Sequence, residues 1–362
     1  MINNEEDILT FQETPFLGKF MVPQMYEIFK FGGGTVKDED RGIERMLQYF
    51  SDFVTEDQLR QNMERYNLQK VFQVVKIYFE REYGYEGKEI TLSNCYQGSI
   101  NNYIYNDMEN PAFVHMDELF ESTVMSFLLA MFKWSKEFDD LEVYGNCFKY
   151  ILFLMNEVCI FGEMQGQDAN DALLQLLSRD MQILQLAEEC YWTIVVFCLA
   201  HEIAHAYLAH TKKKYPKQHP EQEEFDADRI AYHIVLKIIM EGDNELLYLE
   251  KYTYLAPMMF MDFFDLYFYT DRVLYKTSFF DPEHPHLKYR KQCLFSIANK
   301  EVYDFDTSVG NDLYNAFLDV YDEFKDQILL KKERGKLDKI IHTEKRNQIR
   351  RKYYDQTRST PV

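Results

Sequence analysis

The chain has 362 residues, 46% hydrophobic and 16% aromatic, which is enough apolar material for one large core or two smaller ones. Its formal net charge of -20 makes the surface acidic, and an acidic surface repels nucleic acid and anionic membranes. We therefore expect neither as a partner. Glycine and proline are scarce, at 14 and 9 residues, which favours long helices over a turn-rich β architecture.

The cellular compartment is suggested by three features of the sequence. The N-terminus is polar and acidic and does not resemble a signal peptide. The longest apolar runs are too short for a membrane span of about 20 residues, or they contain acidic residues. The six cysteines form no CxxC pair, as is usual for free thiols in a reducing compartment. We expect a soluble, cytoplasmic protein.

The first part of the chain has helical patterning from about residue 41 to 82, between a glycine-rich break at 31–40 and a second break at 83–89. Residues 101–105 and 112–116 are short runs of β-forming residues, and they predict a β-hairpin. Helical patterns fill most of the remainder, at 117–137, 144–161, 170–210, 223–240, 244–272, 285–300 and 309–352. The predicted fold class is mainly α with a small β element.

The C-terminal end is basic, unlike the rest of the chain. Between Lys331 and Lys352 there are ten Lys or Arg and three Asp or Glu, so this segment carries 10 − 3 = +7. The remaining residues therefore sum to -27. The segment could be a helix that docks on the acidic body, or it could contact a polyanion.

A metal site is indicated by the segment CLAHEIAHAYLAH at 198–210. His201 and His205 are four residues apart, which places both imidazoles on one face of a helix, where they can bind one ion. Glu202 follows the first histidine and could accept a proton from water that the metal activates. This is the HExxH pattern of zinc metalloproteases, and it predicts one bound Zn²⁺.

A catalytic zinc site needs a third protein ligand. His210 lies five residues after His205 and is turned away from the ligand face, and His219 lies in a loop beside a proline. Glu224 is the better candidate, because Asp228 is four residues later on the same helix face. Asp228 could then accept the second ring N–H of a zinc-bound histidine and fix its orientation.

HEIAH followed by EFDAD at 224–228 resembles the gluzincin metallopeptidases, especially the HtpX and CAAX-prenyl-protease group. The resemblance implies a zincin-like core with Glu224 as the third ligand and Asp228 behind the ligands. A further segment, DPEHPHLKYRK at 281–291, is similar to the downstream His-Pro box of that group. It implies that His284 and Arg290 face the cleft, with His284 as a donor to the oxyanion and Arg290 holding the structure or the substrate.

Proteases of this kind bind substrate as an added strand on a sheet edge. By this resemblance we expect Ala112, Phe113 and Val114 to form the substrate-binding edge. The HtpX and prenyl-protease enzymes carry membrane helices, whereas this chain is similar in ligand order to the Lit-type phage-exclusion peptidases, which are soluble and act on a host translation factor. That likeness implies a bacterial protease of phage defence or host shutdown. The implied division is an N-terminal region at 1–95, a peptidase domain at 96–300 and C-terminal helices at 301–362.

The predicted function is hydrolysis of peptide bonds inside a protein substrate. One alternative is a zinc-stabilised regulatory or binding module, which would close the site with a fourth protein ligand such as His219 or Glu223. Another is an aminopeptidase or small-molecule hydrolase with the same metal. Because an unrestrained cytoplasmic protease would harm its own cell, we also expect latency, either through an inhibitory partner or through the N-terminal 100 residues or the basic C-terminal segment.

Overall fold

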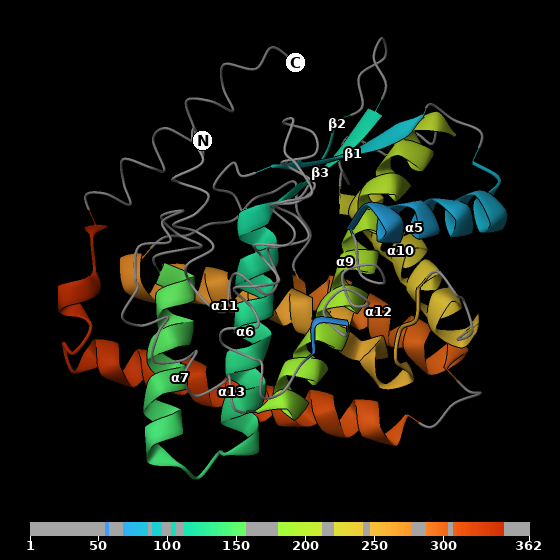
Figure 1. Cartoon of the computed structure of the whole chain (residues 1–362). Coiled ribbons are helices and arrows are strands. Elements are labelled where there is room, and N and C mark those ends of the chain that lie inside the picture. Colours follow the sequence, from blue (N-terminus) through green and yellow to red (C-terminus); the bar gives the residue numbers. More distant parts are fainter. Residues whose placement is uncertain are drawn as a thin grey trace.

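The computed structural model describes residues 55–57, 68–85, 89–95, 103–105, 112–156, 180–211, 221–241, 247–276, 287–302 and 307–343. These ranges contain eight α-helices and three strands, so the prediction of a mainly α protein with a small β element is confirmed. The helices form one body, and the sheet lies at one end of it (Figure 1). The α-helices are α5 (Leu68–Tyr83), α6 (Glu118–Lys136), α7 (Leu141–Phe153), α9 (Met181–His210), α10 (Glu221–Glu241), α11 (Ala256–Tyr275), α12 (Leu287–Glu301) and α13 (Ser308–Glu333).

Helix α9 is the centre of the body. It packs against α5, α6, α10 and α11, and its C-terminal half runs towards the sheet (Figure 1). Its sequence is apolar on every side, which is typical of a helix surrounded by other elements. By length and composition it is the one described helix that could cross a membrane, but 78% of its most apolar window is buried inside the fold. That burial is what a core helix of a packed protein shows.

The start of α9 is set by a capping residue. Asp180 accepts a hydrogen bond from the Ile183 N–H at 3.4 Å and forms an ion pair with Lys136 Nζ at 2.9 Å. An aspartate that caps the first turn satisfies backbone donors that have no partner within the helix. The helix therefore begins at Met181, whereas the sequence predicted a start near residue 170. Residues 157–179 lie outside the described ranges.

Helix α13 crosses one end of the body beside α6 and α11 (Figure 1). Its first turn packs against the 3-10 helix η2 (Lys251–Leu255), and Gly310 makes this approach possible. A Cβ atom at this position would lie 2.5 Å from the Tyr254 ring and 2.9 Å from the Tyr252 carbonyl oxygen. Only glycine fits so close a contact without displacing backbone.

The buried side chains form a single cluster that extends from Leu68 in α5 to Leu337 after α13. This core therefore includes residues from all three predicted parts of the chain. Most of residues 1–95 lie outside the described ranges, so the division into an N-terminal region, a peptidase domain and C-terminal helices stays a prediction.

The sheet has three strands in the order β1-β3-β2, with bounds Ile90–Cys95, Tyr103–Tyr105 and Ala112–Asp117 for β1, β2 and β3. The predicted hairpin is confirmed, since β2 and β3 pair antiparallel with Tyr105 opposite Phe113. The prediction that Ala112, Phe113 and Val114 form a sheet edge is wrong. They lie in the central strand, because β1 pairs with β3 in parallel on the other side, with Ile90 opposite Ala112.

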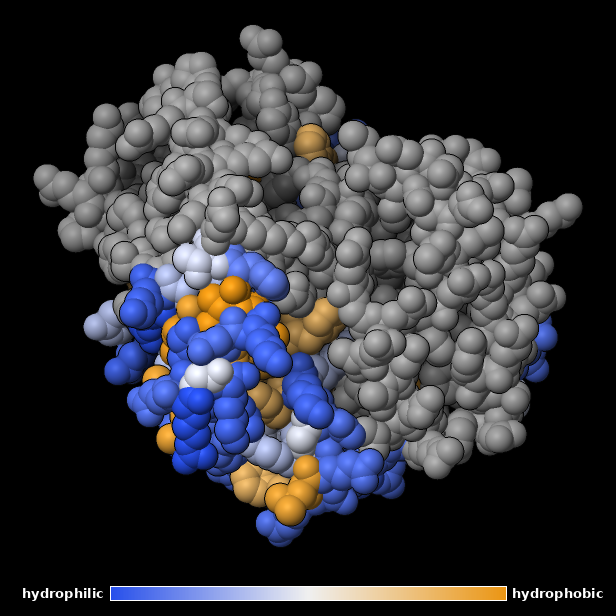
Figure 2. All heavy atoms as spheres, turned by 90° about the vertical axis from the view of Figure 1, so that its left-hand side faces the viewer, coloured by the Kyte–Doolittle hydropathy of each residue, from blue (hydrophilic) through white to orange (hydrophobic). Residues whose placement is uncertain are grey.

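The face formed by α7 and the C-terminal end of α13 is mostly hydrophilic, with apolar side chains between (Figure 2). The basic segment begins here. Lys331 lies over the Phe148 ring, 4.7 Å from its centroid, and Lys332 forms its ion pair with Asp338 of the same segment at 3.8 Å. The described beginning of this segment thus packs on the aromatic rings of α7. Residues 344–362 lie outside the described ranges.

Candidate metal centre

The HExxH motif lies in the last three turns of α9, which ends at His210. The four-residue spacing stacks His201 and His205 on one face, and their Nε2 atoms are 3.1 Å apart. Both rings are largely buried, so the two nitrogens face each other in a site that excludes most water. The helix has brought together two imidazole groups, which bind zinc in their neutral form.

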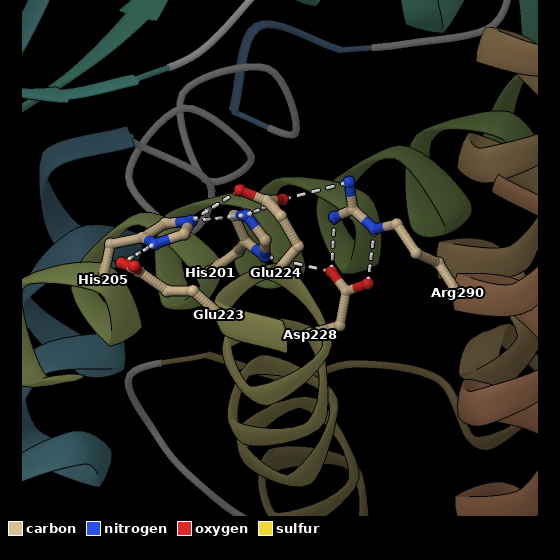
Figure 3. Close-up of polar contacts among 6 residues, drawn as sticks. All are labelled: His201, His205, Glu223, Glu224, Asp228 and Arg290. Atoms are coloured by element: carbon tan, nitrogen blue, oxygen red, sulfur yellow. Dashed lines mark hydrogen bonds and ion pairs between the residues drawn. The ribbon is translucent and has the colours of Figure 1, made fainter. Parts of the chain in front are cut away.

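The first turn of α10 contributes the third group, Glu224. Its Oε2 lies 3.5 Å from His201 Nε2, and its Oε1 lies 3.4 Å from His205 Nε2 (Figure 3). Two nitrogens and a carboxylate group, all within 4.8 Å of one another, can hold a metal ion. Ligand atoms about 2.0–2.1 Å from a tetrahedral ion are about 3.4 Å from one another, so these separations fit a zinc ion.

Behind the three groups lie Asp228 and Arg290. Asp228 Oδ1 is 3.0 Å from His201 Nδ1, the ring nitrogen turned away from Glu224 (Figure 3). The Arg290 guanidinium donates to both oxygens of Asp228 at 2.6 Å, and its Nη1 is 3.1 Å from Glu224 Oε2. Arg290 therefore connects Asp228, which lies beside the ligands, with the candidate ligand Glu224. Such a two-point contact fixes orientation better than a single contact does.

Glu223 has a role that the sequence did not reveal. Its Oε1 lies 3.0 Å from His205 Nδ1, so it orients the second histidine as Asp228 orients the first. In the alternative of a closed structural site, Glu223 or His219 would be the fourth ligand, but Glu223 contacts the ring nitrogen of His205 opposite the shared donor face (Figure 3). No local pattern distinguishes Glu223 from the other acidic residues around it. Only the packing of α10 on α9 brings it to His205.

The electrostatics of the metal-free site follow from this crowding. Burial opposes a charge on His205, but Glu223 and Glu224 outweigh it and raise the pKa of His205 to about 10. Burial would raise the pKa of Glu224, yet His201, His205 and Arg290 hold it far below its usual range. The site thus favours a negative Glu224 beside positive charge, and a divalent cation would take the place of the protons on the imidazoles.

Glu202 differs from the other acidic groups of the site. It is 9% exposed, and burial raises its pKa above the ordinary value while His201 and His205 act in the opposite direction. Within the described residues its carboxylate has no hydrogen-bond or ion-pair partner. A buried carboxylate with a raised pKa, next to a metal ligand, is a candidate general base.

Other residues singled out in the sequence lie apart from this cluster or outside the description. His210 is exposed at the end of α9, with its ring edge-on to Tyr85 at 5.6 Å. His219 and His284 lie outside the described residues, so the oxyanion role of His284 stays a prediction.

The model of the Peptidase U49 family matches residues 107–300, which is more than half of the chain. The chain belongs to the Peptidase U49 family. This membership agrees with the resemblance to Lit-type peptidases in the sequence. Comparisons with curated proteins and with solved structures found no match.

The part that matches Peptidase U49 contains every group of the metal centre, from the α9 histidines to Arg290 of α12. It also contains β3 and α6, which pack against α9. Helix α13 and the basic segment lie beyond it. The family membership implies peptidase activity, and the geometry shows which residues of this chain can support it.

Proposed function

We propose that this member of Peptidase U49 is a zinc-dependent endopeptidase of the gluzincin type. One observation carries the proposal. His201, His205 and Glu224 bring two imidazole nitrogens and a carboxylate to separations of 3.1–3.5 Å, and Glu202 is buried directly after His201 in the same helix. The three groups are the donors of a catalytic zinc site, and Glu202 is the base that such a site requires.

When bound, zinc lowers the pKa of water to about 7 and polarises the carbonyl group of the substrate. The Glu202 carboxylate accepts the proton of the attacking water and passes it to the leaving amine. Burial raises the pKa of Glu202, which makes its carboxylate a stronger base towards this proton than an exposed glutamate. Peptide-bond cleavage then needs no other titrating group among the described residues of the site.

The remaining side chains hold the ligands in place. Asp228 and Glu223 fix the imidazoles of His201 and His205 from their Nδ1 sides, which presents both Nε2 atoms to the same point. Arg290 keeps Asp228 and Glu224 ionised, since burial raises the pKa of each carboxylate and the guanidinium opposes it. The arrangement supplies three protein donors and leaves the fourth position of a tetrahedral ion for chemistry.

The substrate strand is best placed at the edge formed by β2. Within the described residues the sheet has two edges, β1 and β2, and β2 is the edge strand that packs on α9. An extended peptide can add to such an edge through main-chain hydrogen bonds. Substrate addition at Tyr103–Tyr105 replaces the original prediction that the edge is formed by Ala112, Phe113 and Val114.

A purely structural zinc site is less well supported. It would need a fourth protein ligand, and Glu223 lies on the wrong side of His205 to provide one. A purely structural site would also have no use for the buried base Glu202. The resemblance to Lit-type peptidases further suggests a cytoplasmic enzyme of bacterial phage defence or host shutdown, held latent by a partner or by its own terminal segments.

The test is proteolysis of a denatured protein mixture with zinc present, with new N-termini identified by mass spectrometry. Wild type should generate new termini, and Glu202→Gln should reduce their rate of appearance by about 10³-fold, within the range for loss of a general base. Glu188→Gln is the matched control, on the same helix about 20 Å away. Equal rates of cleavage by wild type and Glu202→Gln would contradict the proposal.

A further inference from the structure

Helix α12 carries Arg290, and its packing combines apolar and polar contacts. Its buried residues are Arg290, Leu294 and Ala298, and the half-buried Leu287, Phe295 and Ile297 pack against the core beside them. Apolar contacts have no fixed direction, whereas a charged side chain with a buried partner has one. The placement of the Arg290 guanidinium therefore depends also on the polar contacts of α12.

The contacts of Arg290 with α10 are the first polar contact that holds α12, and Lys291, the next residue, makes the second. Lys291 Nζ lies 2.5 Å from Asp262 Oδ1 on α11, and Tyr314 of α13 donates to Asp262 Oδ2 at 2.6 Å. Asp262 is almost fully buried, so its charge is compensated mainly by these two donors. The contact joins α12 to the α11–α13 part of the molecule, away from the metal centre.

Arg290 and Lys291 bind different helices. Neighbouring residues of a helix point about 100° apart, so Arg290 reaches α10 while Lys291 reaches α11. One buried and one half-buried ion pair in different directions fix both the height and the rotation of α12. A helix released from one of them could move enough to lengthen the 2.6 Å contacts between Arg290 and Asp228.

We propose that Lys291, through Asp262, is a positioning residue of the metal centre: it sets the register of α12 at which Arg290 meets both Asp228 and Glu224. Lys291 itself touches neither of these carboxylates. The inference rests on the proposed function, because it assigns the contact a role in metal binding. A merely structural contact would change stability without changing the site.

A matched control exists on the same part of the fold. Asp265 lies one turn after Asp262 on α11, and it binds Lys325 Nζ at 3.1 Å and the Tyr321 hydroxyl. Lys325 and Lys291 have similar exposed fractions, 26% and 24%. Lys325 belongs to α13 and not to α12. Lys325→Met therefore removes an ion pair of the same residue types, with a more exposed carboxylate (38% for Asp265 against 2% for Asp262), without releasing the helix that carries Arg290.

The experiment measures zinc affinity by competition with a chelating dye for wild type, Lys291→Met, Lys291→Arg and Lys325→Met. Partners that orient metal ligands typically contribute 10–100-fold to affinity, and Lys291 acts one contact further out, so we expect a loss of about 10-fold in Lys291→Met. Lys291→Arg should recover most of it, and Lys325→Met should stay within about two-fold of wild type. Equal zinc affinities in Lys291→Met and Lys325→Met would overturn the proposal.

A second readout needs no metal. The Arg290 Nε–H, assigned by its loss in Arg290→Lys, should exchange faster with solvent in metal-free Lys291→Met than in metal-free Lys325→Met. Unchanged exchange would overturn the positioning role, whereas a wild type that binds no zinc would overturn the proposed function. If Lys291→Met does not fold, Asp262→Asn removes the same ion pair while keeping the hydrogen bond to Tyr314, and the same outcomes apply to it.

Discussion

Two clusters of charged side chains in this molecule have opposite designs. In the cluster on α11, Asp262 and Asp265 each meet a lysine ammonium group, from α12 and α13 respectively, and a tyrosine hydroxyl of α13. In the cluster between α9 and α10, two imidazole nitrogens and one carboxylate crowd together at 3.1–3.5 Å. Their other polar contacts, to Glu223, Asp228 and Arg290, lie around the outside.

The difference distinguishes a charged residue that stabilises the fold from one that serves a functional site. The carboxylates of α11 are satisfied by side chains of the fold, so they need no ligand. The donors of α9 and α10 are oriented towards one another, which is costly unless a cation lies between them. An acidic residue is thus weak evidence of a functional site when considered alone. Its function is indicated by which groups face it, whether donors of the fold or other metal-ligand groups.

The largest expected effect on the free energy of unfolding of the metal-free protein is that of Arg290→Met. This change leaves Asp228, which is 0% exposed, without its guanidinium partner, and should lower the free energy of unfolding by about 3–5 kcal/mol. Denaturant unfolding measures it. Arg229→Met on α10 is the control, because Arg229 is 62% exposed and should contribute less than about 1 kcal/mol. Equal losses in the two variants would remove the distinction between the buried and exposed contacts.

A smaller effect is expected from Tyr321→Phe in the α11–α13 cluster. The change keeps the ring and removes the hydroxyl that donates to Asp265, at a cost of about 1.5–3 kcal/mol for a hydrogen bond to a charged group. Zinc affinity should not change, because the contacts of Asp265 are to Tyr321 and Lys325 of α13 and do not hold helix α12. A shift in zinc affinity would show that Asp265, and not Asp262 alone, is coupled to the metal centre.

The smallest effect concerns Glu223, which is partly exposed. The pKa of His205 is raised in the folded metal-free protein to about 10, so its contribution to stability is fully present below its unfolded pKa of about 6.5. That contribution is lost as the pH rises through about 10. Glu223→Gln should lower the pKa of His205 and shift this loss to lower pH. NMR titration of the His205 ring measures the shift, and an unchanged midpoint would contradict the role given to Glu223.

The sequence predicted much of the site because its signals are local. The four-residue spacing of His201 and His205 places them on one face of any helix, and the spacing of Glu224 and Asp228 does the same on the next. Helix α6 was expected at 117–137 and is found at Glu118–Lys136. The hairpin was also predicted, since two short β-forming runs flank a turn.

Non-local contacts could not be predicted. Strand β1 pairs in parallel with β3, and the first residue of β3 lies 22 positions after the first residue of β1. A parallel pair is not joined by a short turn whose sequence could predict it. That missing strand is why Ala112, Phe113 and Val114 were placed at an edge. The roles of Glu223 and Lys291 depend on which helices pack together, and among 60 acidic residues no local pattern marks Asp262.

The central claim is that His201, His205 and Glu224 hold a metal ion that Glu202 uses but does not bind. The most direct measurement is the zinc content of purified wild type, Glu224→Ala and Glu202→Gln after saturation with zinc and desalting. Wild type and Glu202→Gln should retain about one equivalent, and Glu224→Ala should retain far less, since a three-ligand site loses one protein donor. A full equivalent of zinc in Glu224→Ala would contradict the account.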